Sequence, residues 1–427
     1  MNNEIKLPPD CLGFYCIPLD EESCSLSLEV LNQHSEFRDC KDPFLLFFVR
    51  HKGFDYSLVK LTVEIEQEKK PKLVYLAIKD RRMYVTCNSG TNSSFLSRHA
   101  YFAVYDTMSY CDPKPFGEYD WYDFFEAGKK KSKYLNVICD RRGLTIDLRK
   151  KYKKFWKKGD RLFEFRASDE KSERKPELPV NLNKTGDSEQ LILGYLCCTS
   201  NWWGACVHLP ILVPYRGQLN KARTNVHMFI KMLGPEDVEE SSLTEEQKNL
   251  NAICLQMEEI AWLADRKAWV NEITASPDEI KSKHRELFTL WHAAWPYLAV
   301  QRFLRLYYTV HKELLRMKPV KSEIRPLKIS TARPQIFFIL KDCGEYFELR
   351  LRVKIGKKII SIVHWYEDLF LSADDCYFEY YLFDSYQDLQ LAKFFKSYSH
   401  RFSVLKTHYD GAFAAFVQKL RERYEFL

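Results

Sequence analysis

The chain has 427 residues, of which 46% are hydrophobic, 29% charged and 15% aromatic. This length predicts two or three domains, and the composition excludes a collagen-like, low-complexity or generally disordered protein. Lys and Arg number 65 against 58 Asp and Glu, which gives a net charge of +7. So small an excess permits an anionic partner without requiring one.

The sequence carries no recognisable export or membrane signal. Its 13 cysteines are scattered and odd in number, unlike the disulfide framework of a small secreted domain. The first 30 residues lack the apolar segment of a secretory signal. The longest apolar run, residues 44–49, is far shorter than the ~20 residues that span a bilayer. We therefore expect a soluble, cytoplasmic protein with reduced thiols and no membrane partner.

Residues 1–165 are predicted to form an antiparallel-sheet-rich α+β domain. Strands are expected over residues 56–66, in two runs within 72–87 that flank a hairpin turn at 79–82, and over 134–139 and 144–148, which flank a charged turn closing on Gly143. Helices are expected after residues 92–94 and over residues 119–128. Residues 166–190 have no aromatic and almost no aliphatic side chain, so they are predicted to be an exposed linker.

Residues 191–317 are predicted to be a mixed segment with a helical middle. Short buried strands are expected over 191–198 and 209–214, whereas residues 224–233 fit either a strand or a helix. Thr244 and Gln247 have the spacing of a capping box that begins a helix. A second helix is predicted from Pro277 to Met317, with a kink at Pro296.

The last part of the chain is predicted to be a β-meander followed by two helices. Residues 318–333, with prolines within and beside them, are interpreted as a second linker. In residues 334–427, strands are expected over 335–340, 346–355, 358–365 and 377–383, and helices are expected after Ser385 and Thr407. The whole chain is therefore assigned to the α+β class.

Known catalytic signatures are missing from the sequence. No Gly-Lys pair is followed by Ser or Thr, so there is no P-loop, and neither H-E-x-x-H nor G-x-S-x-G occurs. We therefore predict a protein that is not an enzyme and has no cofactor. One rival hypothesis is an enzyme of unrecognised type centred on Cys206, His208 and the Trp202-Trp203 pair.

Two further groups of residues are assigned to the core. Cys197, Cys198, Cys206 and His208 do not have zinc-ligand spacing, and adjacent cysteines on a strand point to opposite faces, so no metal site is predicted. Trp291, His292 and Trp295 could offer stacking surfaces for bases, but aromatic residues at helical spacing are more often buried.

The strongest local feature is a basic strip, residues 129–161, with 14 Lys and Arg against three Asp. Interleaved aromatic residues suggest phosphate neutralisation with ring stacking. The candidate nucleic-acid-binding residues are Lys129, Lys130, Lys131, Lys133, Arg141, Arg142, Arg149, Lys150, Lys151, Tyr152, Lys153, Lys154, Trp156, Lys157 and Lys158. An alternative interpretation is a solvated edge with Tyr152, Phe155 and Trp156 buried beneath the lysines.

Residues 334–427 also carry a family resemblance. The segments PQIFFILKDCGEYFELRLRVKIGKK, CYFEYYLFDSYQDLQLAKFF and FSVLKTHYDGAFAAFVQKLRERYEF resemble the accessory region that precedes the motor in bacterial Swi/Snf-type helicase-like proteins. The motor itself is not part of this chain, so no ATP-site residue is carried over. The resemblance implies an accessory module that works beside nucleic acid, either as a free-standing subunit, to which an ATPase motor could be supplied in trans, or as the amino-terminal portion of a larger or split translocase.

Together these features predict a non-catalytic accessory or scaffold protein that contacts the phosphates of DNA or RNA without base specificity. The alternative is an interaction adaptor whose basic strip binds an acidic protein and which does not bind nucleic acid.

Overall fold

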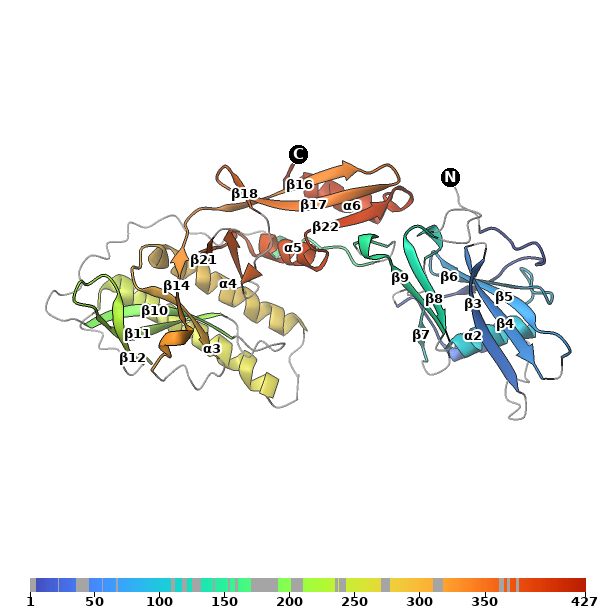
Figure 1. Cartoon of the computed structure of the whole chain (residues 1–427), viewed down its shortest axis with the longest axis horizontal. Helices are drawn as coiled ribbons and strands as arrows, with labels where there is room; N and C mark the ends of the chain where they lie inside the picture. Colours follow the sequence, from blue (N-terminus) through green and yellow to red (C-terminus); the bar gives the residue numbers. More distant parts are fainter. Residues whose placement is uncertain are drawn as a thin grey trace. The chain divides into compact units, whose positions relative to one another are not determined.

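The computed structural model divides the chain into two compact units, residues 1–155 and 156–427 (Figure 1). It describes residues 5–21, 23–35, 46–55, 57–66, 68–108, 112–116, 121–124, 132–140, 143–152, 154–157, 160–169, 191–200, 210–234, 237, 243–269, 277–309, 318–360, 365–366, 369–373 and 376–427. Both units combine antiparallel sheets with helices, which confirms the predicted α+β class.

The first unit is built on a five-stranded antiparallel sheet in the order β1-β6-β5-β4-β3. Its strands are β1 (Tyr15–Pro18), β2 (Ser25–Leu26), β3 (Phe47–Asp55), β4 (Leu58–Ile65), β5 (Lys72–Lys79), β6 (Arg82–Cys87), β7 (Lys114–Pro115), β8 (Leu135–Asp140) and β9 (Gly143–Leu148). Its helices are α1 (Leu28–Gln33), α2 (Arg98–Met108) and the 3-10 turns η3 (Tyr122–Phe124) and η4 (Lys150–Tyr152).

Both hairpins predicted in this unit are present. Strands β5 and β6 pair across Asp80 and Arg81, which both adopt a positive φ and so form the tight turn that a two-residue hairpin needs. Strands β8 and β9 pair from Leu135 opposite Leu148 to Asp140 opposite Gly143. The helix predicted after residue 92 begins only at Arg98, because Ser97 caps it by accepting from the Ala100 N–H.

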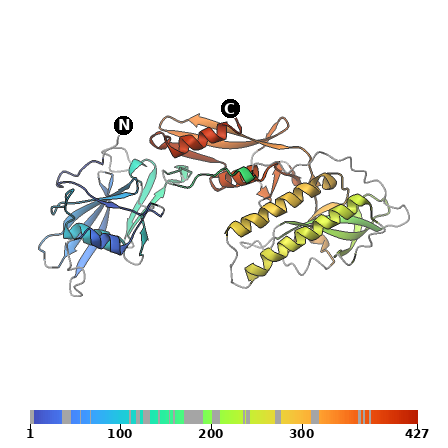
Figure 2. The ribbon, with the colours of Figure 1, turned by 180° about the vertical axis from the view of Figure 1, so that it is seen from behind.

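Helix α2 covers one face of the sheet and contacts β3, β4, β5 and β6; α1 packs beside it (Figure 2). The core between them is apolar, with Phe47 of β3 stacked on Phe102 of α2 at a centroid distance of 4.4 Å. The β8–β9 hairpin contacts the outer strand β3. This contact is the one that matters for the candidate site.

The second unit holds the remaining elements. Its strands are β10 (Leu191–Ser200), β11 (Ile211–Leu219), β12 (Val226–Met232), β13 (Leu304–Thr309), β14 (Ile324–Pro326), β15 (Lys328–Ile329), β16 (Pro334–Asp342), β17 (Tyr346–Ile355), β18 (Lys358–Ile360), β19 (Trp365–Tyr366), β20 (Phe370–Ala373), β21 (Cys376–Tyr381), β22 (Arg401–Leu405) and β23 (Glu425–Phe426). Its helices are α3 (Glu245–Trp269), α4 (Pro277–Ala299), α5 (Tyr386–Ser397) and α6 (Ala412–Arg421), with 3-10 turns η5 (Ala167–Asp169), η9 (Lys321–Glu323) and η10 (Lys406–His408).

The capping box predicted for α3 is confirmed. The Thr244 hydroxyl accepts from the Gln247 N–H at 3.2 Å, and the Thr244 N–H donates to the Gln247 side chain at 3.1 Å. Residues 224–233, which fitted two interpretations, contain strand β12.

The long helix predicted from Pro277 to Met317 stops at Ala299, so the prediction is wrong for residues 300–309, while residues 310–317 lie outside the described residues. Pro296 lies inside helix α4, three residues before its last residue, Ala299. Residues 304–309 are instead strand β13, which pairs in parallel with β10 and presents buried Leu304 and Leu306. The apolar spacing in that segment fits a buried strand as well as a helix.

The segment interpreted as a linker, residues 318–333, also differs from the prediction. It contains β14, which pairs with β13, and β15, which pairs with β21. Both are edge strands, where proline is tolerated because one side of the strand needs no ladder hydrogen bond. Within the second unit, this segment joins two sheets.

Three strands of the predicted C-terminal meander are present as β16, β17 and β18, whereas the fourth predicted strand is β21, which belongs to another sheet with β15 and β20. Strands β20, β22 and β23 were not predicted. Ser385 caps α5 as expected, with its hydroxyl accepting from the Asp388 N–H at 3.1 Å. The last helix begins at Ala412, after Gly411, and Thr407 lies in the preceding 3-10 turn.

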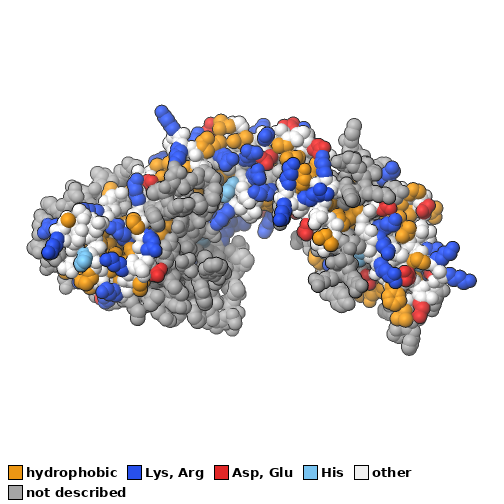
Figure 3. Space-filling view, in the orientation of Figure 1, with side chains coloured by type: hydrophobic (Ala, Val, Ile, Leu, Met, Phe, Trp, Pro, Cys, Tyr) orange, Lys and Arg blue, Asp and Glu red, His pale blue; other side chains and the backbone are white. Residues whose placement is uncertain are grey.

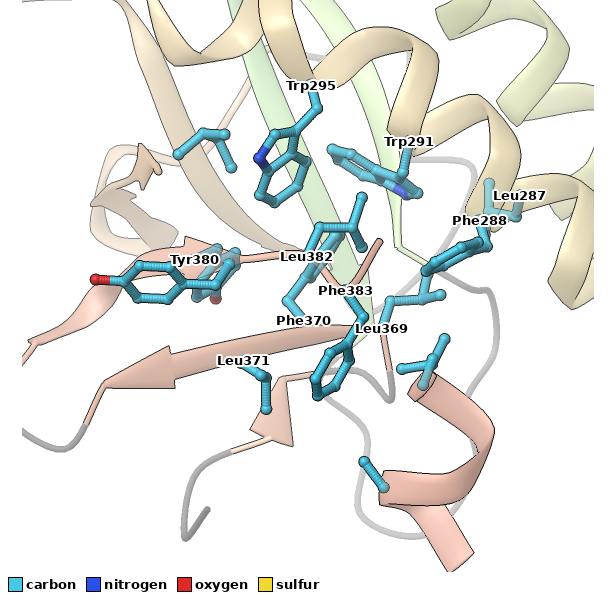
Figure 4. Close-up of a cluster of buried hydrophobic side chains, with 14 of the residues drawn as sticks. Leu287, Phe288, Trp291, Trp295, Leu369, Phe370, Leu371, Tyr380, Leu382 and Phe383 are labelled. Atoms are coloured by element: carbon cyan, nitrogen blue, oxygen red, sulfur yellow. The ribbon is translucent and has the colours of Figure 1, made fainter. Parts of the chain in front are cut away.

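One continuous core runs through the second unit, so the predicted division at residues 318–333 does not separate two cores. Trp291 and Trp295 of α4 pack on Phe370 of β20, at centroid distances of 4.8 and 5.8 Å (Figure 4). The predicted boundary near residue 165 falls inside this unit, since residues 160–169 pack on the same core through Phe163 and Phe165. None of the helices in the described ranges combines the length and apolar character needed to cross a membrane.

Candidate nucleic-acid interface

The part of the basic strip that lies in the first unit is built on a cluster of aromatic rings. Phe124, Tyr134 and Phe155 are buried and meet edge to face, with centroids 5.4 to 5.9 Å apart. Tyr152 of η4 joins them, 5.0 Å from Tyr134 and 5.6 Å from Phe155, and keeps part of its ring exposed. Edge-to-face pairs of this kind fix the orientation of the rings, so the cluster is a rigid base for the lysines around it.

Lys150 and Lys151 are exposed cations of this surface. Both lie on η4 and are exposed. In the part of the chain that the structure describes, neither of them forms an ion pair. The Lys151 ammonium lies 5.5 Å from the centre of the Tyr152 ring, and that of Lys133 lies 5.0 Å from the centre of Tyr134. Positive charge is therefore held close to ring faces, as it is in sites that combine phosphate contact with stacking.

Arg149 also supports the hairpin. Its Nε donates to the Leu135 carbonyl at 3.0 Å and its Nη2 donates to the Ser132 carbonyl at 3.1 Å. A guanidinium has five N–H groups, so donors remain for an anion. Lys154, the remaining described candidate in the first unit, is half-buried.

Trp156 does not have the stacking role expected from the sequence. It belongs to the second unit, is 2% exposed, and its ring packs against Phe413 at 5.4 Å. Its indole N–H donates to the Asp160 carbonyl, and its backbone N–H donates to Ser403 of β22. The ring is part of the core, which corrects the prediction. Lys157, next to it, is half-buried.

Other candidates lie outside the described residues. They are Lys129, Lys130, Lys131, Arg141, Arg142, Lys153 and Lys158 of the strip, and Trp202, Trp203, Cys206 and His208 of the rival enzyme hypothesis. Cys197 and Cys198 are described and buried in β10, and no group of three or more metal-ligating side chains occurs among the residues with described positions.

Trp291, His292 and Trp295 are core residues, as predicted. All three are at most 4% exposed. The Trp291 indole donates to the Pro210 carbonyl, and His292 Nε2 lies 2.6 Å from the Phe383 carbonyl. These contacts satisfy polar atoms inside the core.

The structure adds a row of residues that the sequence analysis missed. On β3, Phe48, Arg50 and Lys52 are exposed while the residues between them are half-buried; we call these three the β3 row. The β3 row lies on a strand that contacts β8 and β9. Alternation with a period of two from residue 47 onward was the signal that could have revealed it.

A polar cluster at the start of α2 was also missed. His99 Nδ1 lies 3.3 Å from the Ser89 hydroxyl, and its Nε2 lies 3.0 Å from a Glu68 carboxylate oxygen. The Ser89 hydroxyl also contacts Cys87 Sγ and Ser97 Oγ. Burial lowers the pKa of His99. The Glu68 carboxylate opposes this lowering, and the nearby positive charges of Lys72 and Arg98 add to it. Because Ser89 and Ser97 are tied into the turn before α2, we assign this cluster a structural role.

Comparison of the chain with protein-family models, curated proteins and solved structures found no match.

Proposed function

We propose that the first unit binds nucleic acid through its phosphates, as part of a non-catalytic accessory protein. The observation that carries the proposal is the pair Lys150 and Lys151, exposed on η4 and based on the Tyr134–Tyr152–Phe155 cluster. Lysine acts on phosphate as a point charge, so such contacts favour backbone binding without base specificity.

The charge distribution supports the same proposal. The strip's excess of eleven basic residues, fourteen against three, exceeds the net charge of +7 for the whole chain. In the first unit, Lys and Arg side chains lie among hydrophobic ones on the visible face (Figure 3). The resemblance of residues 334–427 to the region before Swi/Snf-type motors further supports a role beside nucleic acid.

The test is binding of the purified chain to fluorescent 20-nucleotide single strands and 20-base-pair duplexes of random sequence over a salt series. The logarithm of the association constant falls linearly with the logarithm of the salt concentration. Each lysine that contacts a phosphate makes this fall steeper by about 0.7 to 0.9. Changing Lys150→Gln and Lys151→Gln together should therefore make the salt dependence shallower by about 1.5.

A matched control is available in the second unit. Lys357 and Lys358 are likewise adjacent and exposed, at the turn between β17 and β18, so their change to Gln removes the same charge from another surface. We expect that control to keep the wild-type slope. Absence of binding at low salt would overturn the proposal and favour the adaptor with an acidic protein partner. An equal loss in both double variants would show a general effect of net charge and would also overturn it.

A further inference from the structure

We infer that the β3 row makes the first unit a binder of single-stranded nucleic acid, with Phe48 as a stacking surface for a base. The inference rests on the proposed function, because it takes the lysines of η4 as the phosphate contacts. It adds the class of nucleic acid and a residue that contacts a base.

The first step is the exposure of Phe48. This ring is 56% exposed, while its neighbours Phe47 and Val49 pack on the core under α2. The strand alternation therefore directs Phe48 to the opposite face of the sheet. A single exposed apolar residue is common, so exposure by itself does not define a site.

The second step is the charge on the same row. The Arg50 side chain is 61% exposed, and it forms an open, well-screened ion pair with Glu64 at 3.4 Å. Lys52 follows two residues on and is exposed. Charged residues on an edge strand protect it from pairing with other chains. Edge protection explains Arg50 and Lys52 but gives no reason for an exposed Phe beside them.

The third step is position. Strand β3 contacts the β8–β9 hairpin, and η4 with Lys150 and Lys151 follows that hairpin directly. Strand β8 also exposes Ile138, which is 49% exposed. Aromatic, aliphatic and basic side chains are thus exposed on neighbouring elements of one unit, and this is the combination that tracks a backbone and stacks bases in single-strand binders.

The last step is selectivity. In a duplex both faces of each base are already stacked on neighbouring bases. A protein ring can therefore stack on a base only in a single strand or where a base pair has opened. Phe48 should therefore strengthen binding to single strands and leave duplex binding nearly unchanged.

The experiment compares wild type with Phe48→Ala and Phe48→Trp, using a fluorescent 20-nucleotide oligo-dT strand and a 20-base-pair duplex. Loss of one base–aromatic stack corresponds to a weakening of about 5- to 150-fold. We expect this loss for Phe48→Ala on the single strand, with less than a twofold change on the duplex and an unchanged salt slope. Phe48→Trp should bind the single strand at least as tightly as wild type.

Ile359→Ala is the matched control, since Ile359 is 57% exposed on β18 in the second unit. It should leave both affinities unchanged. Single-strand binding by Phe48→Ala at the wild-type level, or an equal loss on both probes, would overturn the inference. Suppose that Phe48→Ala gives one of these contradicting results but the salt slope still depends on Lys150 and Lys151. The inference then fails while the proposed function stands, whereas a wild-type chain that binds neither probe refutes both the inference and the proposed function.

Discussion

Tyr134 and Tyr152 meet edge to face with ring centroids 5.0 Å apart, and each ring carries a lysine ammonium within 5.5 Å of its centre. The start of β8 and the turn η4 are therefore held together by their rings, while the lysines lie outside. The rings stabilise this region and the lysines carry its charge, so stability and charge can be changed separately at these residues.

Replacing Tyr134 should show this separation. Tyr134 is 5% exposed, and truncation of a buried aromatic side chain costs about 3–5 kcal/mol. We expect Tyr134→Ala to lower the free energy of unfolding of the first unit by that order, measured by urea denaturation. Lys150→Gln is the control, since exposed substitutions usually change stability by less than about 0.5 kcal/mol. Comparable losses in the two variants would contradict the assignment of Tyr134 as the support.

The cap of α3 gives a second prediction. Thr244 and Gln247 satisfy each other's backbone N–H groups, so Thr244→Ala should cost about 0.5–2 kcal/mol. Thr244→Ser keeps the hydroxyl and should recover most of that free energy of unfolding. A double-mutant cycle with Gln247→Ala tests reciprocity: strictly additive losses would mean that the two bonds do not support one another.

This cap also shows what the sequence alone could establish. Thr244, Gln247 and Ser385 were found because capping depends on residues three apart in the chain. The two hairpins were found because their turn chemistry is equally local. Strand β13 was missed because its parallel partner β10 lies more than 100 residues earlier, and local periodicity cannot report such pairing.

The candidate site was predictable in part for the same reason. A run of lysines is visible in the sequence, so Lys150 and Lys151 were correctly expected to be basic surface residues. Whether an aromatic ring between lysines faces solvent depends on its packing against residues that are distant in the sequence. Tyr152 keeps exposed surface, whereas Trp156 is buried against Phe413, more than 250 residues away in the sequence. The β3 row becomes a candidate only once the hairpin is known to contact strand β3.

Acid should destabilise the first unit through its buried histidines. Burial lowers the pKa of His99 and of His51 in the folded state, while the unfolded value is about 6.5. As pH falls through 6.5, the unfolded chain takes up protons that the folded chain does not, so the free energy of unfolding falls until the folded pKa is passed. Urea denaturation between pH 8 and pH 5 measures this slope.

His99→Gln should make the fall of the free energy of unfolding with decreasing pH shallower. The contributions of His51 and His34 should remain, because burial also lowers the pKa of each of them. Charge repulsion from Lys72 and Arg98 acts in the same direction as burial, while Glu68 acts against it. A His99→Gln variant with the full wild-type slope would show that His99 does not contribute to the acid sensitivity.

A close contact in the second unit gives the last prediction. A Cβ placed on Gly194 of β10 would clash with Cζ of Tyr215, which faces it on β11. The Tyr215 ring is fully buried, and its hydroxyl donates to the Phe303 carbonyl at 3.0 Å, so the ring cannot move without losing that bond. Alanine normally stabilises a strand relative to glycine by roughly 0.5–1 kcal/mol, but here the steric clash outweighs this gain.

We therefore expect Gly194→Ala to lower the free energy of unfolding by about 1–3 kcal/mol, the usual cost of overpacking. Tyr215→Leu removes the clashing end of the ring, so Gly194→Ala should cost far less in that background than in wild type. A double-mutant cycle by urea denaturation measures the coupling. Equal costs of Gly194→Ala in both backgrounds would mean that the glycine is required for another reason, because the ring would then not be the obstacle.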